Sequence, residues 1–391
     1  MRKRIIRTGI VLFSCLGSLL ILEILLGIIR PRYGRLAWTE GEEGFFQLDE
    51  RRIYRLSPSS SYPKEETDSL FYRTNDRGFR YAPEASPAGE TKMRILMVGD
   101  SFTFGKGVSH EEAYPARVQS ILNSTGIPAE VVNAGVPGYG IDQEYRYLTD
   151  ELIPQQSPDI IVWNLNANDV DDTNKACLYA VRSSTLVPFS GRRNLLYLQG
   201  VFAKKSPPMF KKSNIFRFLL YTSNAIIGSD RFTFGCSAPI RGSREVMYRA
   251  FREKLAIYLP RVRAALSKRN AKLIITMMPF EYYFDPRRTN DPIIADYHAI
   301  QQTLAALSES NVDLNEVIAA QRDPGLYSLR TGRMIPPELP DESGSPQPGG
   351  NIIESLYLPE KNPFDGAHLN GLGNNFIAQH VAEVLREALL P

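Results

Sequence analysis

Residues 94–105, with the sequence RILMVGDSFTFG, constrain the fold of this chain more than any other segment. Ile95 to Val98 form a short apolar run, which is typical of a strand buried on both faces of a sheet. A Gly-Asp-Ser turn ends this run at Ser101. Ligands of open α/β sheets bind at the carboxyl ends of the strands, so Ser101 is placed like a nucleophile. Serine and aspartate are also ordinary turn and helix-cap residues, and the interpretation therefore depends on partner residues.

The rest of the chain repeats an alternation of apolar strands and amphipathic helices. A strand, helix, strand, helix, strand order is typical of a parallel sheet with helices on both faces. We therefore expect an α/β fold of three layers around a mainly parallel sheet of about five strands. The predicted strands start near residues 94, 131, 159, 271 and 312, and the main predicted helices cover 111–122, 142–152, 213–221, 243–268 with a break near Pro260, and 372–389.

A seryl hydroxyl is a weak nucleophile until a base takes its proton, and the base needs an orienting group. Of the four histidines, His110, His298 and His380 are interpreted as structural or solvated residues. His368 lies in a glycine-broken loop ahead of the last helix, and Asp365 precedes it by three residues. Such a loop can direct both side chains toward one point, although Asp-x-x-His alone is a weak signal.

An ester-cleaving serine also needs donors for the oxyanion that forms when the carbonyl is attacked. Residues 131–140 read as a strand followed by a glycine-rich loop, in which Gly138 can bring its N–H close to a substrate. Residues 159–169 form another apolar run that ends in polar residues, and Asn168 can offer its amide. The third candidate donor is the backbone amide of Ser101. Taken singly, these are also an ordinary turn glycine and strand-end asparagine.

Together, these segments resemble the SGNH (GDSL-type) hydrolase superfamily, whose four sequence blocks centre on Ser, Gly, Asn and His. The matching residues, in the family's order, are Gly99-Asp100-Ser101 with Gly105, the loop holding Gly138, Asn168-Asp169, and Asp365 to His368. The resemblance covers 92–172 and 271–390 well, and 173–270 and 280–350 poorly. Asn166 stands where the third block usually begins with Gly, and Gly138 is chosen over Gly135 and Gly140 for its distance from Asn133.

The resemblance implies an α/β/α SGNH-hydrolase-like fold and a serine esterase without a cofactor or metal. Ser101 would be the nucleophile, His368 the general base and then acid, and Asp365 the group that orients the imidazole. The amides of Ser101 and Gly138 and the side chain of Asn168 would form the oxyanion hole. Activity should then fall on acidification, because a protonated histidine cannot accept the seryl proton.

The N-terminus predicts a membrane anchor. Residues 1–7 are a basic segment expected in the cytoplasm, and the apolar run 8–29 would form a helix about 33 Å long, enough to cross a bilayer as a signal anchor. Glu23 is the costly residue in that run. Residues 30–91 are interpreted as a stalk and docking segment, and 92–390 as the catalytic domain with insertions at 173–270 and 280–350. The domain is then expected to be periplasmic or extracellular.

Other classes of function are disfavoured. A net charge of +3 with mixed signs gives no nucleic-acid footprint, and no metal-ligand cluster stands out. The run from Gly99 to Gly107 does not have the spacing of a phosphate loop. Cys177 and Cys236 can pair in an oxidising compartment or remain free and buried, and the sequence does not choose between these states.

The leading hypothesis is hydrolysis of an O-acyl ester, and acetyl on a cell-surface polysaccharide or glycolipid is the substrate that the resemblance implies. Within the superfamily, the chain most resembles membrane-anchored members associated with bacterial surface polysaccharides, through its N-terminal run and residues 74–80. A first alternative is an O-acyltransferase, in which a glycan hydroxyl resolves the acyl-enzyme. A second alternative is a catalytically silent glycan-binding or assembly protein on the same fold.

Overall fold

The computed structural model describes residues 2–33, 44–62, 71–80, 92–188, 195–207, 210, 213–227, 244–278, 292–307, 311–313, 369 and 371–389. Three residues named above, Asp365, His368 and Cys236, lie outside these ranges.

The centre of the protein is a five-stranded sheet in which every pairing is parallel, as predicted. Its strand order is β11-β10-β7-β5-β6. The order in which strands are added to the sheet changes side at β5: β6 lies on one side of β5, and β7, β10 and β11 lie on the other. Open α/β sheets bind their ligands at such a topological switch point. The strands are β5 (Met93–Gly99), β6 (Ala129–Gly135), β7 (Ile160–Leu165), β10 (Lys272–Met277) and β11 (Asn311–Asp313).

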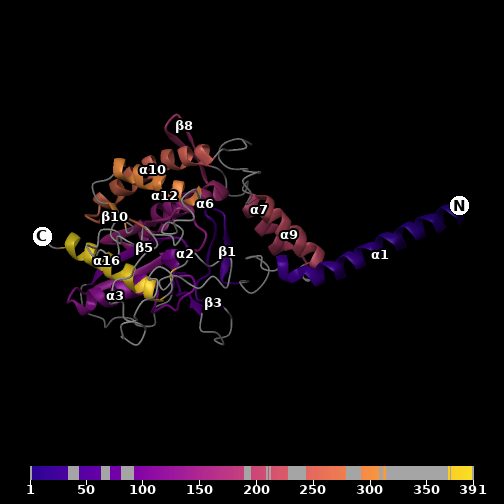
Figure 1. Cartoon of the computed structure of the whole chain (residues 1–391), viewed down its shortest axis with the longest axis horizontal. Coiled ribbons are helices and arrows are strands. Elements are labelled where there is room, and N and C mark those ends of the chain that lie inside the picture. Colours follow the sequence, from indigo (N-terminus) through magenta and orange to yellow (C-terminus); the bar gives the residue numbers. More distant parts are fainter. Residues whose placement is uncertain are drawn as a thin grey trace, which may run out of the picture.

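Helices cover both faces of this sheet, so the three-layer expectation holds (Figure 1). α3 packs against α16 on one side, while α10 packs against α12 and α4 on the other. These helices are α3 (Tyr114–Ser124), α4 (Ile141–Tyr147), α10 (Arg244–Ser267), α12 (Pro292–Leu307) and α16 (Gly371–Leu389). The remaining helices are α1 (Arg2–Tyr33), α2 (Ser101–Phe104), η1 (Leu148–Leu152), α5 (Ile153–Gln156), α6 (Asp169–Ala176), α7 (Leu195–Lys205) and α9 (Asn214–Ile227).

Two proline positions correct the predicted helices. α3 begins at Tyr114, later than the predicted residue 111, and Pro115 occupies its first turn, where a missing N–H costs nothing. The predicted break near Pro260 is wrong, because α10 runs through that residue. Tyr258, Leu259 and Val262 beside it are fully buried, so packing on both sides of the proline holds the helix together.

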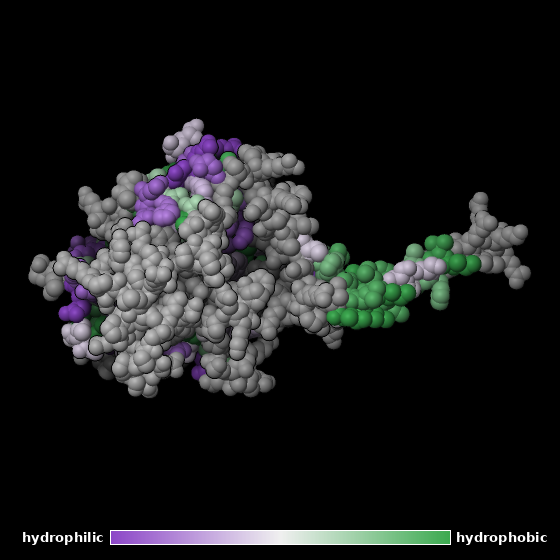
Figure 2. Space-filling view, in the orientation of Figure 1, coloured by the Kyte–Doolittle hydropathy of each residue, from purple (hydrophilic) through white to green (hydrophobic). Residues whose placement is uncertain are grey.

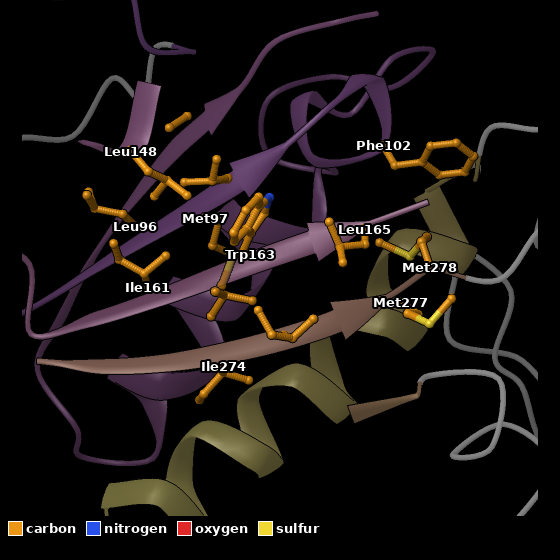
Figure 3. Close-up of a cluster of buried hydrophobic side chains, with 14 of the residues drawn as sticks. Leu96, Met97, Phe102, Leu148, Ile161, Trp163, Leu165, Ile274, Met277 and Met278 are labelled. Atoms are coloured by element: carbon orange, nitrogen blue, oxygen red, sulfur yellow. The ribbon is translucent and has the colours of Figure 1, made fainter. Parts of the chain in front are cut away.

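The core lies between the sheet and its two helical layers. Residues of β5, β7 and β10 alternate their side chains into both layers, and Trp163 is completely buried at the centre (Figure 3). The Trp163 indole donates to Glu144 Oε2 on α4 at 2.7 Å, which satisfies its only polar atom.

The segment before β5 docks on the core. It forms two small antiparallel pairs, β1 (Phe46–Asp49) with β2 (Ile53–Leu56) and β3 (Ser61–Tyr62) with β4 (Tyr72–Arg73). Its last described residue, Arg80, is buried and donates to the backbone oxygens of Phe104, Gly105 and Val108, the latter two at 2.6 Å. Its guanidinium also stacks over the Tyr72 and Phe104 rings. This arginine therefore ties the N-terminal segment to the loop that follows α2.

Helix α6 leads into a third antiparallel pair, β8 (Tyr179–Arg182) with β9 (Thr185–Pro188). The buried carboxylate of Asp142 on α4 holds this region, since it accepts from Lys254 Nζ and Tyr258 Oη of α10, each at 2.8 Å. Asp142 also accepts from the Leu178 amide at 2.8 Å. Cys177 is disulfide-bonded and Cys15 is free.

Helix α1 extends away from the domain and exposes large apolar side chains along most of its described length (Figures 1 and 2). Within the described ranges, no helix combines the length and the apolarity that crossing a bilayer requires. The prediction of a transmembrane helix over 8–29 is therefore not supported.

Candidate active site

Ser101 occupies the position predicted from the sequence, directly after β5 and at the start of α2. The side chain of Asp100 caps α2 by accepting from the Phe102 amide at 3.0 Å. Gly105 ends the helix in the left-handed region, with φ of 79°, which glycine adopts without strain. The resulting strand-turn-helix leaves the Ser101 side chain partly exposed, with its Oγ at 3.5 Å from Asp100 Oδ2.

The loop after β6 lies against this turn. The Val136 amide donates to Gly99 O at 3.0 Å, so the ends of β5 and β6 are joined. A Cβ on Gly135 would lie 2.2 Å from the Phe104 backbone nitrogen, and only glycine allows α2 to approach this closely. Gly138 follows with φ of 75°, in the left-handed region.

Tyr54 is a residue of this site that the sequence did not single out. It comes from β2 in the docking segment, and its hydroxyl donates to Pro137 O at 2.8 Å. A Cβ on Gly138 would lie 2.8 Å from the same hydroxyl. Tyr54 lies within residues 30–91, which the sequence identifies only as a stalk and docking segment, and no local signal places it beside the glycine loop.

The end of β7 brings two asparagines to Asp100. Asn166 Nδ2 donates to Asp100 Oδ1 at 2.6 Å, and Asn168 Nδ2 donates to Asp100 Oδ2 at 2.8 Å. Asn166, the residue that departs from the family pattern, therefore holds the Gly-Asp-Ser turn from the end of the neighbouring strand. Asp100 connects both asparagines to the turn that carries Ser101.

Asn168 makes a second contact that bears on its predicted role. Its Nδ2 also donates to Asp172 Oδ2 at 3.0 Å, so the amide nitrogen serves two carboxylates. An amide nitrogen carries two hydrogens. For Asn168 to donate to an oxyanion, the substrate must replace one of these carboxylate acceptors.

A line of hydrogen bonds continues from this point across the sheet. Asn164 Nδ2 donates to Asn166 Oδ1 at 3.3 Å, and Thr276 Oγ1 of β10 donates to Asn164 Oδ1 at 3.0 Å. All three side chains are buried. Because buried polar groups are costly when unpaired, this line fixes the orientation of Asn166 and hence its bond to Asp100.

Three buried carboxyl groups, those of Asp100, Glu144 and Asp169, lie in or near the turn. Burial raises the pKa of Asp100 to about 6, the charge of Asp172 adds to the rise, and hydrogen bonds from Asn168 and the Phe102 and Ser101 amides oppose it. Burial also raises the pKa of Glu144 and of Asp169 well above the usual carboxyl range.

The neighbouring charges of Glu144 and Asp100 add to the rise at Asp169. The Asp169 carboxyl accepts from the backbone N–H of Asn166 at 2.7 Å, and this bond holds the loop after β7.

The predicted base and its orienting group, His368 and Asp365, lie outside the described residues. The next residue along the chain, Leu369, is described and buried, and its backbone oxygen accepts from Asn374 Nδ2 at 2.9 Å. Asn374 Oδ1 in turn accepts from the Tyr114 amide at 3.0 Å.

The Tyr114 hydroxyl shares a hydrogen bond of 3.0 Å with Thr103 Oγ1 on α2. A continuous set of contacts thus connects the residue after His368 to the short helix that begins with Ser101.

The other histidines have the environments expected of structural or solvated residues. Burial lowers the pKa of His110 to about 4, and the nearby Arg80 charge adds to this effect. His298 is exposed and contacts Gln301, while His380 is buried and its Nδ1 lies 2.9 Å from Phe376 O. Across the residues that the structure describes, no group of three or more His, Cys, Asp and Glu side chains could hold a metal ion.

The chain matches the model of the GDSL-like Lipase/Acylhydrolase family over residues 97–374, which is more than half of its 391 residues. No curated protein sequence matches it. Similar solved structures include a lipase/acylhydrolase from Enterococcus faecalis, which is 16% identical with a TM-score of 0.39 over 76% of this chain and 96% of that one. A family 3 carbohydrate esterase from Clostridium thermocellum is 15% identical with a TM-score of 0.36, over 76% of this chain and 98% of that one.

The family match begins within β5 and spans the Ser101 turn, the Gly138 loop and Asn168. The fold, with the Ser101 turn at the switch point of a parallel sheet, agrees with it. The chain therefore belongs to the GDSL-like lipase/acylhydrolase family and is an SGNH-type serine hydrolase that acts on ester bonds.

Proposed function

We propose that this enzyme removes a small O-acyl group, such as acetyl, from a cell-surface polysaccharide or glycolipid. Ser101 attacks the ester carbonyl, His368 takes its proton and later returns it to the leaving alcohol, and Asp365 orients the imidazole. The amides of Ser101 and Gly138 and the side chain of Asn168 stabilise the oxyanion. Water then hydrolyses the acyl-enzyme.

The observation that carries this proposal is the junction at Asp100. It caps the short helix that begins with Ser101 and accepts from both Asn166 and Asn168, so the ends of two neighbouring strands are fixed around one serine. The contacts that connect Leu369, the residue after His368, to Thr103 on α2 support the proposed role of His368.

The proposed oxyanion hole includes an exchange step. The Asn168 amide serves two carboxylates in the free enzyme, and the bond to Asp172 is the longer of the two, at 3.0 Å against 2.8 Å to Asp100. Asp172 also pairs with Lys175 at 2.8 Å, so it keeps a partner when Asn168 turns to the substrate. Asp100 then continues to hold Asn168 in place.

The direct test uses an O-acetylated polysaccharide and the full chain. Free acetate should appear with the unchanged enzyme, should be absent with Ser101→Ala, and should be unaffected by Ser124→Ala, a matched change at an exposed helix position. Acetyl found on an added glycan acceptor would identify the transferase alternative. Failure to form any acetyl-enzyme would instead support the silent binding protein.

We also propose that the catalytic domain lies outside the cytoplasm, attached to a membrane through the N-terminal helix. The disulfide at Cys177 supports an oxidising compartment, and the apolar side chains exposed on α1 support a lipid environment. Protease added to intact spheroplasts should then digest the domain. Digestion only after the cells are permeabilised would contradict this location.

A further inference from the structure

The exposed large apolar side chains of the described chain gather on one part of the molecule. Most of these side chains lie on α1 between Ile10 and Ile28. The remaining apolar side chains of this region lie on α7, at Phe210 and on α9, where Leu219 is 60% exposed. Figure 2 shows this region as a mostly green projection, whereas the coloured areas of the domain in the same view are largely purple. Outside this region, Val187 of β9 is the one described large hydrophobic residue in the exposed class, at 36%.

Helices α1 and α9 are far apart in sequence but pack directly together. The contact centres on Glu23, whose carboxylate accepts from Ser213 Oγ at 2.8 Å and from the Ile215 amide at 3.0 Å, with a further bond from the Asn214 amide. Gly27 leaves room for this contact, since a Cβ there would lie 3.0 Å from Asn214 Nδ2. A side chain of α1 therefore caps the first turn of α9.

This cap removes the main obstacle to lipid contact. A carboxylate in an apolar helix is expensive in hydrocarbon unless it is paired or hydrogen-bonded. Glu23 has hydrogen-bond donors at the N-terminus of α9, whose dipole also favours a negative charge. The pairing satisfies the Glu23 carboxylate and the first amides of α9 at the same time.

The exposed surface fits lipid better than a protein partner. A helix that packs on one partner carries an apolar stripe, whereas α1 exposes large apolar side chains at consecutive positions such as Leu19, Leu20, Ile21 and Leu22, which point in all directions around the helix. The sequence also places Arg2, Lys3, Arg4 and Arg7 at its start, where they complement anionic lipid headgroups.

We infer that α9 is a second lipid-contacting helix, held beside α1 by the Glu23 cap, so that the two enter a bilayer surface as one unit. This inference rests on the proposed membrane attachment and requires neither helix to cross the bilayer. Helix α7 connects the unit to the domain: its Phe202 ring packs on Phe216 of α9, and a Cβ on its Gly200 would lie 2.6 Å from Leu48 Cδ2 of β1.

The test places a tryptophan at Leu219 in the full chain and adds vesicles of phosphatidylethanolamine and phosphatidylglycerol with brominated acyl chains, which quench indoles inserted among them. Leu20→Trp reports on α1, and Val187→Trp is the matched control, because that side chain is exposed outside the apolar region. The native tryptophans give the same background in all three variants. The fluorescence added by Leu219→Trp and Leu20→Trp should be mostly lost on brominated vesicles, whereas that of Val187→Trp should be retained.

Quenching at Leu20→Trp without quenching at Leu219→Trp would overturn this inference while leaving the membrane attachment intact. Absence of quenching at both positions would overturn the two together. A blue shift at Leu219→Trp that grows with protein concentration without vesicles would show that a second copy of the chain covers α9, and would also refute the inference. Adding Glu23→Leu to Leu219→Trp should restore part of the lost fluorescence, and an unchanged value would refute the role of the cap.

Discussion

Replacement of Asp100 by asparagine tests the electrostatics of the turn that carries Ser101. Burial raises the pKa of this carboxyl to about 6, against a value of 3.8 for an unperturbed aspartate. The folded state therefore binds a proton more tightly than the unfolded state. A raised acid pKa contributes stability that is fully present below about pH 4 and is lost as the pH rises through about 6. A shift of about 2 pKa units corresponds to roughly 3 kcal/mol.

Asp100→Asn removes this titration but keeps the size of the side chain. The difference in unfolding free energy between the unchanged protein and the variant should therefore fall by roughly 3 kcal/mol between pH 4 and pH 7. The variant should also lose stability by an amount that does not vary with pH. The single oxygen of the new amide cannot accept from both Asn166 and Asn168, and a buried donor left unpaired costs about 1–3 kcal/mol.

Urea unfolding followed by the fluorescence of buried Trp163 measures the two contributions at a series of pH values. Asp76→Asn is the control, since Asp76 is exposed, and its difference from the unchanged protein should stay constant with pH. If the difference in unfolding free energy for Asp100→Asn were also constant with pH, the pKa of Asp100 would be the same in the folded and unfolded states. Burial would then not raise this pKa.

Three further changes test the supports of the site. Arg80→Met removes the donor of three backbone carbonyls and should destabilise the protein by at least about 2 kcal/mol in urea unfolding, with part recovered in Arg80→Lys. Lys254→Met leaves the buried Asp142 carboxylate without its cation and should cost about 3–5 kcal/mol by the same method. Asn168→Ala should lower kcat on p-nitrophenyl acetate by on the order of a hundredfold while the protein still unfolds cooperatively in urea, and an undiminished kcat would remove Asn168 from the oxyanion hole.

The positions of the strands followed from the sequence, because short apolar runs bounded by glycine and polar residues leave few alternatives to buried strands. Ser101, Gly138 and Asn168 were chosen as candidates for the same reason, and the structure places each just beyond the end of such a strand. The prediction of a break at Pro260 failed because local propensity was allowed to outweigh packing, which holds α10 together there.

Contacts between distant segments could not be predicted. Tyr54 and Arg80 reach the site from residues 30–91, the predicted stalk and docking segment. Nothing in the sequence around either residue indicates which loop it contacts. The occupation of the Asn168 amide by two carboxylates, and the cap that Glu23 provides for α9, likewise depend on tertiary structure alone.

Covalent labelling of the full chain with a fluorophosphonate probe, followed by mass spectrometry of the modified peptide, tests whether Ser101 is the nucleophile. Such a probe reacts with an activated serine, so we expect one adduct, on Ser101, that disappears in Ser101→Ala and persists in Ser124→Ala. An adduct on another residue, or a folded protein that takes no label, would contradict the assignment of Ser101 as the nucleophile.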